Sequence, residues 1–194
     1  MDLTEWLIVG LGNPGRNYKN TWHSIGFEVV NILSERWKVP FKAGKGDFYY
    51  CQNTLDNQKV TLMMPLTYMN LSGSVVLHWV KYFKVDFANI LVVYDDNDLP
   101  LGRIRLRERG TDGGHRGMAD IIRRLGVDDI PRLRIGINYG SCKKELSYRV
   151  LSKIPRSLTD RVDSILMTAA DAVEMVLQQG VVAAMNKYNA IEIE

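Results

Sequence analysis

The sequence has few of the residues that stabilise small extracellular domains or anchor a chain in a membrane. Its 194 residues include only two cysteines, Cys51 and Cys142, which stand far apart and match neither a disulfide framework nor a zinc site. The stretch MDLTEW at the start has no basic region and no apolar core, so we expect no signal peptide. No apolar run approaches the roughly 20 residues that span a bilayer. These absences predict a cytoplasmic protein without a membrane partner.

The motifs of covalent catalysis are also missing. There is no Gly-x-Ser-x-Gly elbow, and neither cysteine has a histidine neighbour in the pattern, so no covalent nucleophile is indicated. Of only three histidines, His78 lies in the helical pattern SVVLHWVKYF and is expected to be structural, whereas His23 and His115 lie in polar loops. The remaining hydrolytic option is a water molecule activated by a histidine whose tautomer an aspartate holds.

The net positive charge of the chain is confined to one segment. The formal net charge is +3, yet residues 103–134 hold nine arginines and five acidic residues, so this segment alone exceeds the charge of the whole chain. Arginine suits phosphate recognition, because its planar fork binds oxygen atoms in pairs. The alternative is a solvated, partly self-neutralised surface.

Apolar patterns predict an α/β fold. Residues 1–194 are expected to form a single domain, with a twisted mixed, largely parallel central sheet flanked by helices. Alternation within residues 103–107 places Ile104 and Leu106 in the core and the arginines outside. The expected strands are 5–11, 48–53, 59–64, 90–94, 103–107 and 133–138, and the expected helices are 25–37, 72–83, 117–125, 158–178 and 181–188.

The first strand leads into a loop with the spacing Gly10-x-Gly12-x-x-Gly15, which is that of dinucleotide-binding proteins. Such a loop needs a helix that begins inside the motif, so that its N–H groups meet the pyrophosphate. Here Pro14 removes one donor, and the helical pattern starts about ten residues late. We therefore expect no nucleotide cofactor. The loop instead carries Asn13, Tyr18 and His23 at a strand end, where ligand sites of α/β sheets collect.

Polar residues also follow the expected strand 90–94. Asp95, Asp96 and Asp98 offer carboxylates to a metal ion, but the stretch lacks the glycine and distal glutamate of a calcium loop, and no second acidic cluster is obvious. The better interpretation is that one aspartate orients a histidine while the others cap or turn the chain. Because Asp95 ends a central strand, a pair with His23 is geometrically reasonable.

Two further loops carry polar side chains. In PLTYMNLSG, residues 65–73, Met69 and Asn70 offer an apolar contact and an amide, although Asn70 is equally expected as a helix N-cap. In RGTDGGHRGM, residues 109–118, a glycine-rich loop holding His115 and Arg116 leads into a helix. That loop either closes over a substrate or accepts a phosphate at the helix N-terminus.

Together these loops resemble those of bacterial-type peptidyl-tRNA hydrolase. They keep that family's order and spacing over nearly the whole chain. The matching stretches are VGLGNPGRNYKNTWHSIGF, PLTYMNLSG, YDDNDLPLGRIRLR, GTDGGHRGM and RLRIGI.

The resemblance implies hydrolysis of the ester between a peptide and the terminal ribose of tRNA, which recycles tRNA after stalled or aborted translation. It implies that His23 is the general base, that Asp95 orients it, and that Asn13 positions the peptide carbonyl or water. It also implies a monomer that needs neither metal nor cofactor. The residues that it assigns to the substrate, the acceptor arm and the 3′ CCA end are Tyr18, Met69, Asn70, His115, Arg116, Arg105, Arg107 and Arg134.

The sequence departs from the family pattern in two places. The common TRHN is TWHS, with Trp22 and Ser24, and the common GGHNG is GGHRG, so Arg116 replaces an asparagine. An arginine can hold a phosphate or a carbonyl but cannot accept a hydrogen bond. These departures leave one alternative to the hydrolase open, an RNA-binding relative without catalysis. A nucleotide-cofactor enzyme, on the glycine spacing alone, is a third hypothesis, for which we expect no bound dinucleotide.

Overall fold

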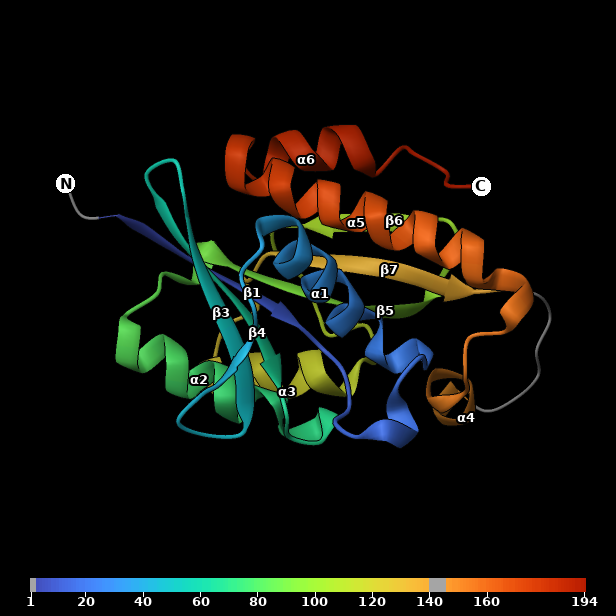
Figure 1. Cartoon of the computed structure of the whole chain (residues 1–194), viewed down its shortest axis with the longest axis horizontal. Coiled ribbons are helices and arrows are strands. Elements are labelled where there is room, and N and C mark those ends of the chain that lie inside the picture. The colour runs from blue at the N-terminus through green and yellow to red at the C-terminus, as the bar shows by residue number, and fades with distance from the viewer. Residues whose placement is uncertain (1–2, 140–145) are drawn as a thin grey trace.

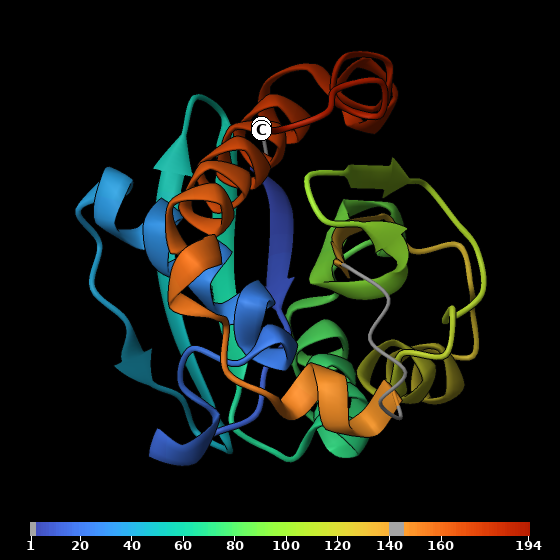
Figure 2. The same ribbon diagram turned by 90° about the vertical axis from the view of Figure 1, so that its right-hand side faces the viewer.

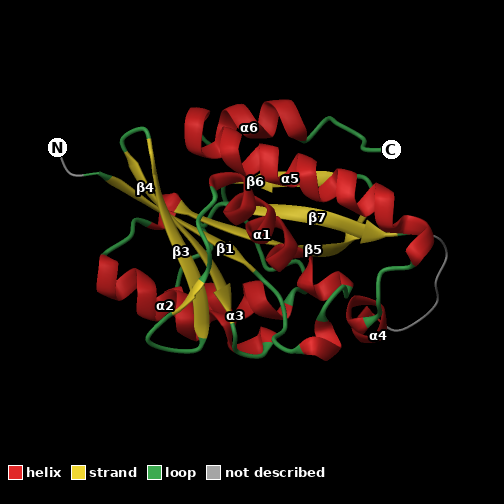
Figure 3. Cartoon of the chain, viewed as in Figure 1, coloured by secondary structure: helices red, strands yellow, loops and turns green. Residues whose placement is uncertain are grey.

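One seven-stranded mixed sheet forms the centre of the computed structural model, which describes residues 3–139 and 146–194 (Figures 1 and 3). The strand order is β2-β3-β4-β1-β5-β7-β6. The central strands β4, β1, β5 and β7 are parallel, and the outer strands pair antiparallel. The strands are β1 (Thr4–Gly10), β2 (Lys42–Ala43), β3 (Phe48–Leu55), β4 (Gln58–Pro65), β5 (Ile90–Pro100), β6 (Ile104–Arg107) and β7 (Arg132–Asn138).

Helices cover both faces of the sheet, because its strands are apolar on both sides (Figure 2). In β1, Ile8 packs in the core on the side of α1 and α5, whereas Leu7 and Val9 pack on the side of α2 and α3. The helices are α1 (Ile25–Trp37), α2 (Ser72–Phe83), α3 (Arg116–Leu125), α4 (Leu146–Leu151), α5 (Thr159–Gln179) and α6 (Val181–Tyr188). The predicted fold class is therefore confirmed. No helix in the described part of the chain is both long and apolar enough to cross a membrane.

The glycine-rich loop after β1 leads through short turns to α1, which begins only at Ile25, as predicted. Gly10 is needed for packing: a Cβ atom there would lie 2.2 Å from the carbonyl oxygen of Gly26 in α1. Gly15 has a φ angle of 102°, which favours glycine. These glycines therefore serve close helix packing and a turn. No α-helix begins inside the motif to cradle a pyrophosphate.

Strand β5 is longer than its sequence predicts. Its apolar part ends at Tyr94, but pairing with β7 continues through Asp95 and Asp96, and resumes at Pro100 after an irregularity. The polar residues after Tyr94 do not show a strand pattern in the sequence. They are part of the strand because their backbone pairs with β7. Two short elements, β2 and α4, were also not predicted. Cys51 is buried and free, and Cys142 lies outside the described residues.

Candidate active site

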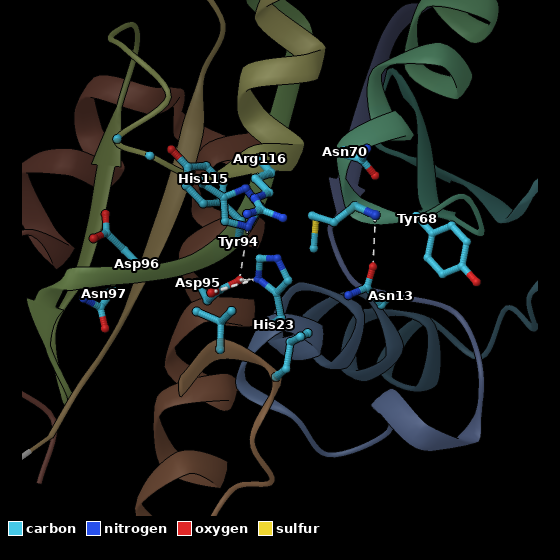
Figure 4. Close-up of a pocket in the computed structure, with 15 residues that line it drawn as sticks. Asn13, His23, Tyr68, Asn70, Tyr94, Asp95, Asp96, Asn97, His115 and Arg116 are labelled. Carbon is cyan, nitrogen blue, oxygen red and sulfur yellow. Dashed lines mark hydrogen bonds and ion pairs between the residues drawn. The ribbon is translucent and has the colours of Figure 1, made fainter. Parts of the chain in front are cut away.

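A pocket of about 530 Å³ opens where β1 and β4 end, beside residues 94–97 of β5 and between the N-terminus of α3 and the short helix α4 (Figure 4). The chain leaves β1 toward β4 on one side and later returns to β5 on the other, so this edge is a switch point of the topology. We call it the histidine pocket. It is lined by Asn13, His23, Tyr68, Met69, Asn70, Tyr94, Asp95, Asp96, Asn97, Gly113, Gly114, His115, Arg116, Val150 and Leu151.

His23 and Asp95 form the predicted hydrogen bond. Nδ1 of His23 lies 2.8 Å from Oδ1 and 3.1 Å from Oδ2 of Asp95, and both residues are buried. His23 belongs to a single 3-10 turn before α1, which the hydroxyl of Thr21 stabilises by donating to the carbonyl of Tyr18 at 2.7 Å. Because a carboxylate only accepts hydrogen bonds, Nδ1 of His23 carries the proton. Nε2 then keeps its lone pair, and it has no protein partner among the described residues.

Asp95 also accepts a hydrogen bond from a second histidine. Nε2 of His115 lies 3.2 Å from Oδ1 of Asp95, while its Nδ1 accepts the backbone N–H of Met118 at 3.2 Å and caps α3. The proton of a neutral His115 is therefore on Nε2, so the two histidines are opposite tautomers. Both ring nitrogens of His115 are thus engaged by protein groups. This arrangement fits a residue that holds Asp95 better than one that binds substrate.

Burial and hydrogen bonding in this cluster shift the pKa values of Asp95 and of the neighbouring Tyr94. Burial would raise the pKa of Asp95, but the electrostatic attraction and hydrogen bonds of His115 and His23 together lower that pKa below its usual range. The carboxylate therefore stays ionised at neutral pH. Burial raises the pKa of Tyr94 to about 12, so its phenol stays neutral; its ring packs against His115 with the centroids 4.6 Å apart.

The loops after β1 and β4 fix the orientation of an amide in the histidine pocket. Oδ1 of Asn13 accepts the backbone N–H of Met69 at 2.9 Å, which leaves the Nδ2 amide protons of Asn13 free to donate into the pocket. Asn70 lines the pocket and is exposed. The alternative that Asn70 caps a helix is wrong, because α2 begins at Ser72 with Leu71 at the cap and no side-chain capping bond.

One cluster in this pocket has the composition of a metal site. A nitrogen from His23, one from His115 and an oxygen from Asp95 all lie within 4.8 Å of one another. A metal ligand must offer a lone pair, however. Nδ1 of His115 accepts the N–H of Met118, so the proton of the neutral ring is on Nε2, and Nε2 has no lone pair for a metal ion. The carboxylate of Asp96 points elsewhere, to Arg134. The geometry therefore favours a hydrogen-bonded His-Asp-His cluster over metal coordination.

Three of the predicted arginines line pockets. Arg116, at the first position of α3, lines the histidine pocket and has no side-chain partner among the described residues; Figure 4 shows it reaching in beside His115. Arg107 and Arg134 line a second pocket of about 420 Å³, which shares Gly113 with the first. We call it the arginine pocket; it is lined by Arg107, Glu108, Arg109, Gly110, Thr111, Gly113, Arg132, Arg134 and Met185.

Three predicted residues lie outside both pockets. Arg105 is exposed on β6, where Ile104 and Leu106 are buried as predicted. Tyr18 is part of a 3-10 turn, and its backbone carbonyl holds the turn that precedes His23. His78 is exposed on α2 and is not part of the core, although the helical pattern suggested a structural role.

The sequence did not indicate several residues of the histidine pocket. Tyr68 lies at the rim of the pocket, 64% exposed and directly before the predicted Met69 in the sequence. Its aromatic ring was the only feature of the sequence that could have indicated a substrate contact. Val150 and Leu151 come from α4, a single short helix without a recognisable period. Asp96 was expected only to turn the chain. It does so by accepting the backbone N–H groups of residues 98 and 99, and it also binds an arginine.

The comparisons with known proteins agree with this geometry. The model of the family described as peptidyl-tRNA hydrolase matches residues 7–194. A peptidyl-tRNA hydrolase of Clostridium botulinum strain Okra is 40% identical over 189 residues, which cover 97% of this chain and 99% of the relative. One from Clostridium novyi is 37% identical over 187 residues, covering 96% and 99%.

Solved structures show the same relationship. The crystal structure of peptidyl-tRNA hydrolase from Acinetobacter baumannii superimposes with a TM-score of 0.90 at 34% identity, covering 99% of this chain and 98% of that one. A futalosine hydrolase of Helicobacter pylori shares only the fold, with a TM-score of 0.57 and 9% identity over 91% of this chain and 100% of that one. With the family model matched over nearly its whole length, the chain belongs to the peptidyl-tRNA hydrolase family.

Proposed function

We propose that this protein hydrolyses the ester that joins a peptide to the 3′-terminal ribose of tRNA, using water activated by His23. The observation that carries the proposal is the buried pair of His23 and Asp95, whose free Nε2 stands in the same pocket as the amide of Asn13. The activity releases tRNA from peptidyl-tRNA that translation has abandoned, and we expect a cytoplasmic monomer.

The reaction needs one base and one proton carrier. Nε2 of His23 takes a proton from water as the oxygen attacks the ester carbonyl, and Asp95 stabilises the imidazolium that forms. The imidazolium then gives its proton to the departing ribose oxygen. Because a ribose hydroxyl is a good leaving group, no covalent enzyme intermediate is needed. General base catalysis of this kind contributes roughly 10²–10⁴-fold to the rate.

The tetrahedral intermediate carries a negative oxygen that needs hydrogen-bond donors. The Nδ2 group of Asn13 is one, because its oxygen is already committed to Met69. The guanidinium of Arg116 is a second candidate, since it lines the same pocket and lacks a protein partner among the described residues. One such donor is worth about 3–4 kcal/mol in the transition state. Asn70 and the side chain of Met69 then form the wall along the substrate.

The same guanidinium gives a physical reason for selecting peptidyl over free aminoacyl esters. A free α-amino group is an ammonium, which Arg116 would repel and which is costly to desolvate. An acylated amino group carries no charge and can enter the histidine pocket. Arg105, Arg107 and Arg134 would hold the acceptor arm by its phosphates, an interaction that positions RNA without reading its sequence and weakens with salt.

Within the TWHS stretch, the side chains of Trp22 and Ser24 do not line the histidine pocket. Trp22 is fully buried, with its ring 5.2 Å from that of Tyr139, and Ser24 is buried within the turn. Both side chains therefore serve packing beneath His23. This supports a working hydrolase over an RNA-binding relative without catalysis, because the base, its orienting aspartate and Asn13 all remain.

The test is release of peptide from N-acetyl-aminoacyl-tRNA. The wild-type protein should cleave this substrate and leave the corresponding free aminoacyl-tRNA largely intact. His23→Ala should still bind tRNA and should lose at least about 10²-fold in kcat. Tight tRNA binding by the wild type without any peptide release would favour the non-catalytic alternative. Release at an equal rate by His23→Ala would overturn the assignment of the base.

A further inference from the structure

Four arginines face one another at the edge of the sheet. The register between β6 and β7 places Arg105 opposite Arg134 and Arg107 opposite Arg132. Like charges directly opposite in a sheet repel, so this edge favours a bound anion. The guanidinium of Arg132 is already engaged by backbone carbonyls, which leaves the other three to attract one. In the described part of the chain, Asp96 supplies the only carboxylate within ion-pair distance of any of the four, and it binds Arg134.

The carboxylate of Asp96 is held by the backbone of its own turn. Oδ1 accepts the N–H of Asp98 at 2.8 Å and that of Leu99 at 3.3 Å, whereas Oδ2 accepts the Nε–H of Arg134. The side chain of Asp96 is only 4% exposed, so it cannot turn away. A guanidinium has five N–H groups, and this contact engages one. The terminal amino groups of Arg134 have no other partner among the residues that the structure describes.

Asp96 and Arg134 stand in the wall between the two pockets. Asp96 lines the histidine pocket, Arg134 lines the arginine pocket, and Gly113 lines both. Figure 4 shows the Asp96 carboxylate turned away from His23, on the far side of the Asp95 carboxylate. Two consecutive residues thus divide the work: Asp95 holds the histidines, and Asp96 holds an arginine of the neighbouring pocket.

We propose that Asp96 is a positioning residue that aims the guanidinium of Arg134 at a phosphate of the tRNA acceptor arm. Through the shared backbone of residues 95 and 96, it fixes the distance between that phosphate and the ester at His23. This inference rests on the proposed function for its substrate. Its prediction about RNA affinity, however, can be measured without turnover.

The substitution Asp96→Asn separates orientation from packing. The amide oxygen can still accept the N–H groups of Asp98 and Leu99, so the turn is kept. The amide nitrogen then faces the Nε–H of Arg134, and two donors cannot bond to each other. The guanidinium must swing out of its position while every arginine of the edge remains. Asp98→Asn is the matched control, because Asp98 is exposed on the same strand and the charge change is the same.

The first experiment compares the variants on two substrates and one ligand. For Asp96→Asn, the KM for N-acetyl-aminoacyl-tRNA and the Kd for deacylated tRNA should both rise about 5- to 20-fold, with the salt dependence of log Kd reduced by about one phosphate contact. Its kcat should stay within about twofold, as should its turnover of an N-acyl-aminoacyl ester of adenosine, which has no phosphate. Asp98→Asn should behave like the wild type. An unchanged Kd for Asp96→Asn, or an equal loss on both substrates, would overturn the proposal.

A double-variant cycle shows whether Asp96 acts through Arg134. In an Arg134→Gln background, Asp96→Asn should cause no further loss of tRNA affinity. The double variant removes both charges of the ion pair, so the buried Asp96 position is not left with an unpaired charge. Losses that add in the double variant would contradict the proposal. A wild-type protein that binds tRNA without releasing peptide would refute the hydrolase function and leave this inference standing on the Kd values.

Discussion

The substitution Asp95→Asn tests the hydrogen-bonded cluster that holds His23. It keeps the size of the side chain and removes only its charge and one acceptor. Oδ1 of Asp95 receives both histidines, at 2.8 Å from His23 and 3.2 Å from His115. In the variant, either the oxygen or the nitrogen of the new amide must take that position.

Neither orientation of the amide satisfies the cluster. If nitrogen takes the place of Oδ1, it meets the Nε2–H of His115, whose tautomer cannot change because Nδ1 accepts the backbone N–H of Met118. In that orientation His23 loses its shorter hydrogen bond and keeps only the amide oxygen at the place of Oδ2, 3.1 Å from Nδ1, while the neighbouring amide nitrogen favours the tautomer that shows a proton to the pocket. If oxygen keeps the place, the amide nitrogen lies about where Oδ2 was, 3.1 Å from the N–H of His23. In both cases the imidazolium of the transition state loses its counter-charge.

We therefore expect kcat to fall about 10³–10⁴-fold, the range expected when a base is left in the wrong tautomer without its carboxylate. The KM for N-acetyl-aminoacyl-tRNA should change little, because Asp95 lies buried beneath His23. Single-turnover release of labelled peptide with excess enzyme measures the chemical step, and deacylated tRNA binding checks the fold. Asp98→Asn serves again as the control. A kcat within threefold of the wild type would refute the reasoning, and so would a defect confined to KM.

Further predictions follow from single groups. Asn13→Ala should lower kcat about 10²–10³-fold in peptide release, because it removes a donor to the oxyanion; an effect only on tRNA binding would refute that role. Because the pKa of Asp95 is lowered, its contribution to stability is complete above about pH 4 and is lost as the pH falls further. For the same reason Asp95 stays ionised over the acid limb of kcat/KM, which should therefore show one ionisation and not two. Burial raises the pKa of Glu28, so ionising it opposes folding as the pH rises; Glu28→Gln should raise Tm at pH 8 more than at pH 5, and equal gains in thermal melts would contradict this.

The sequence predicted the parts of the fold that have long, apolar patterns. The helices at 25–37, 72–83 and 181–188 have the observed bounds, and the alternation of Ile104 and Leu106 gave the correct faces of β6. The polar end of β5 was missed because its hydrogen bonds come from a partner strand, and no local pattern records a partner. The helix α4 was missed because six residues show too little of a helical period.

The candidate site was partly predictable for a similar reason. Loops after parallel strands meet at one edge of a sheet, so the pairing of His23 with Asp95 followed from chain order. The second bond of Asp95, to His115, was not predictable, because it depends on how closely α3 approaches β5. The resemblance implied that Arg134 holds a phosphate, and nothing in the sequence indicated that part of its guanidinium is bonded to Asp96.

The protonation of the two histidine rings tests the central claim most directly, because the proposed base must present a lone pair to the pocket. Nitrogen-15 NMR of the neutral imidazoles distinguishes a protonated from an unprotonated ring nitrogen at each position. The hydrogen bonds predict opposite tautomers: His23 protonated at Nδ1 with Nε2 free, and His115 protonated at Nε2. If Nε2 of His23 carries the proton in the free enzyme at neutral pH, that nitrogen cannot take a proton from water, and the mechanism is contradicted.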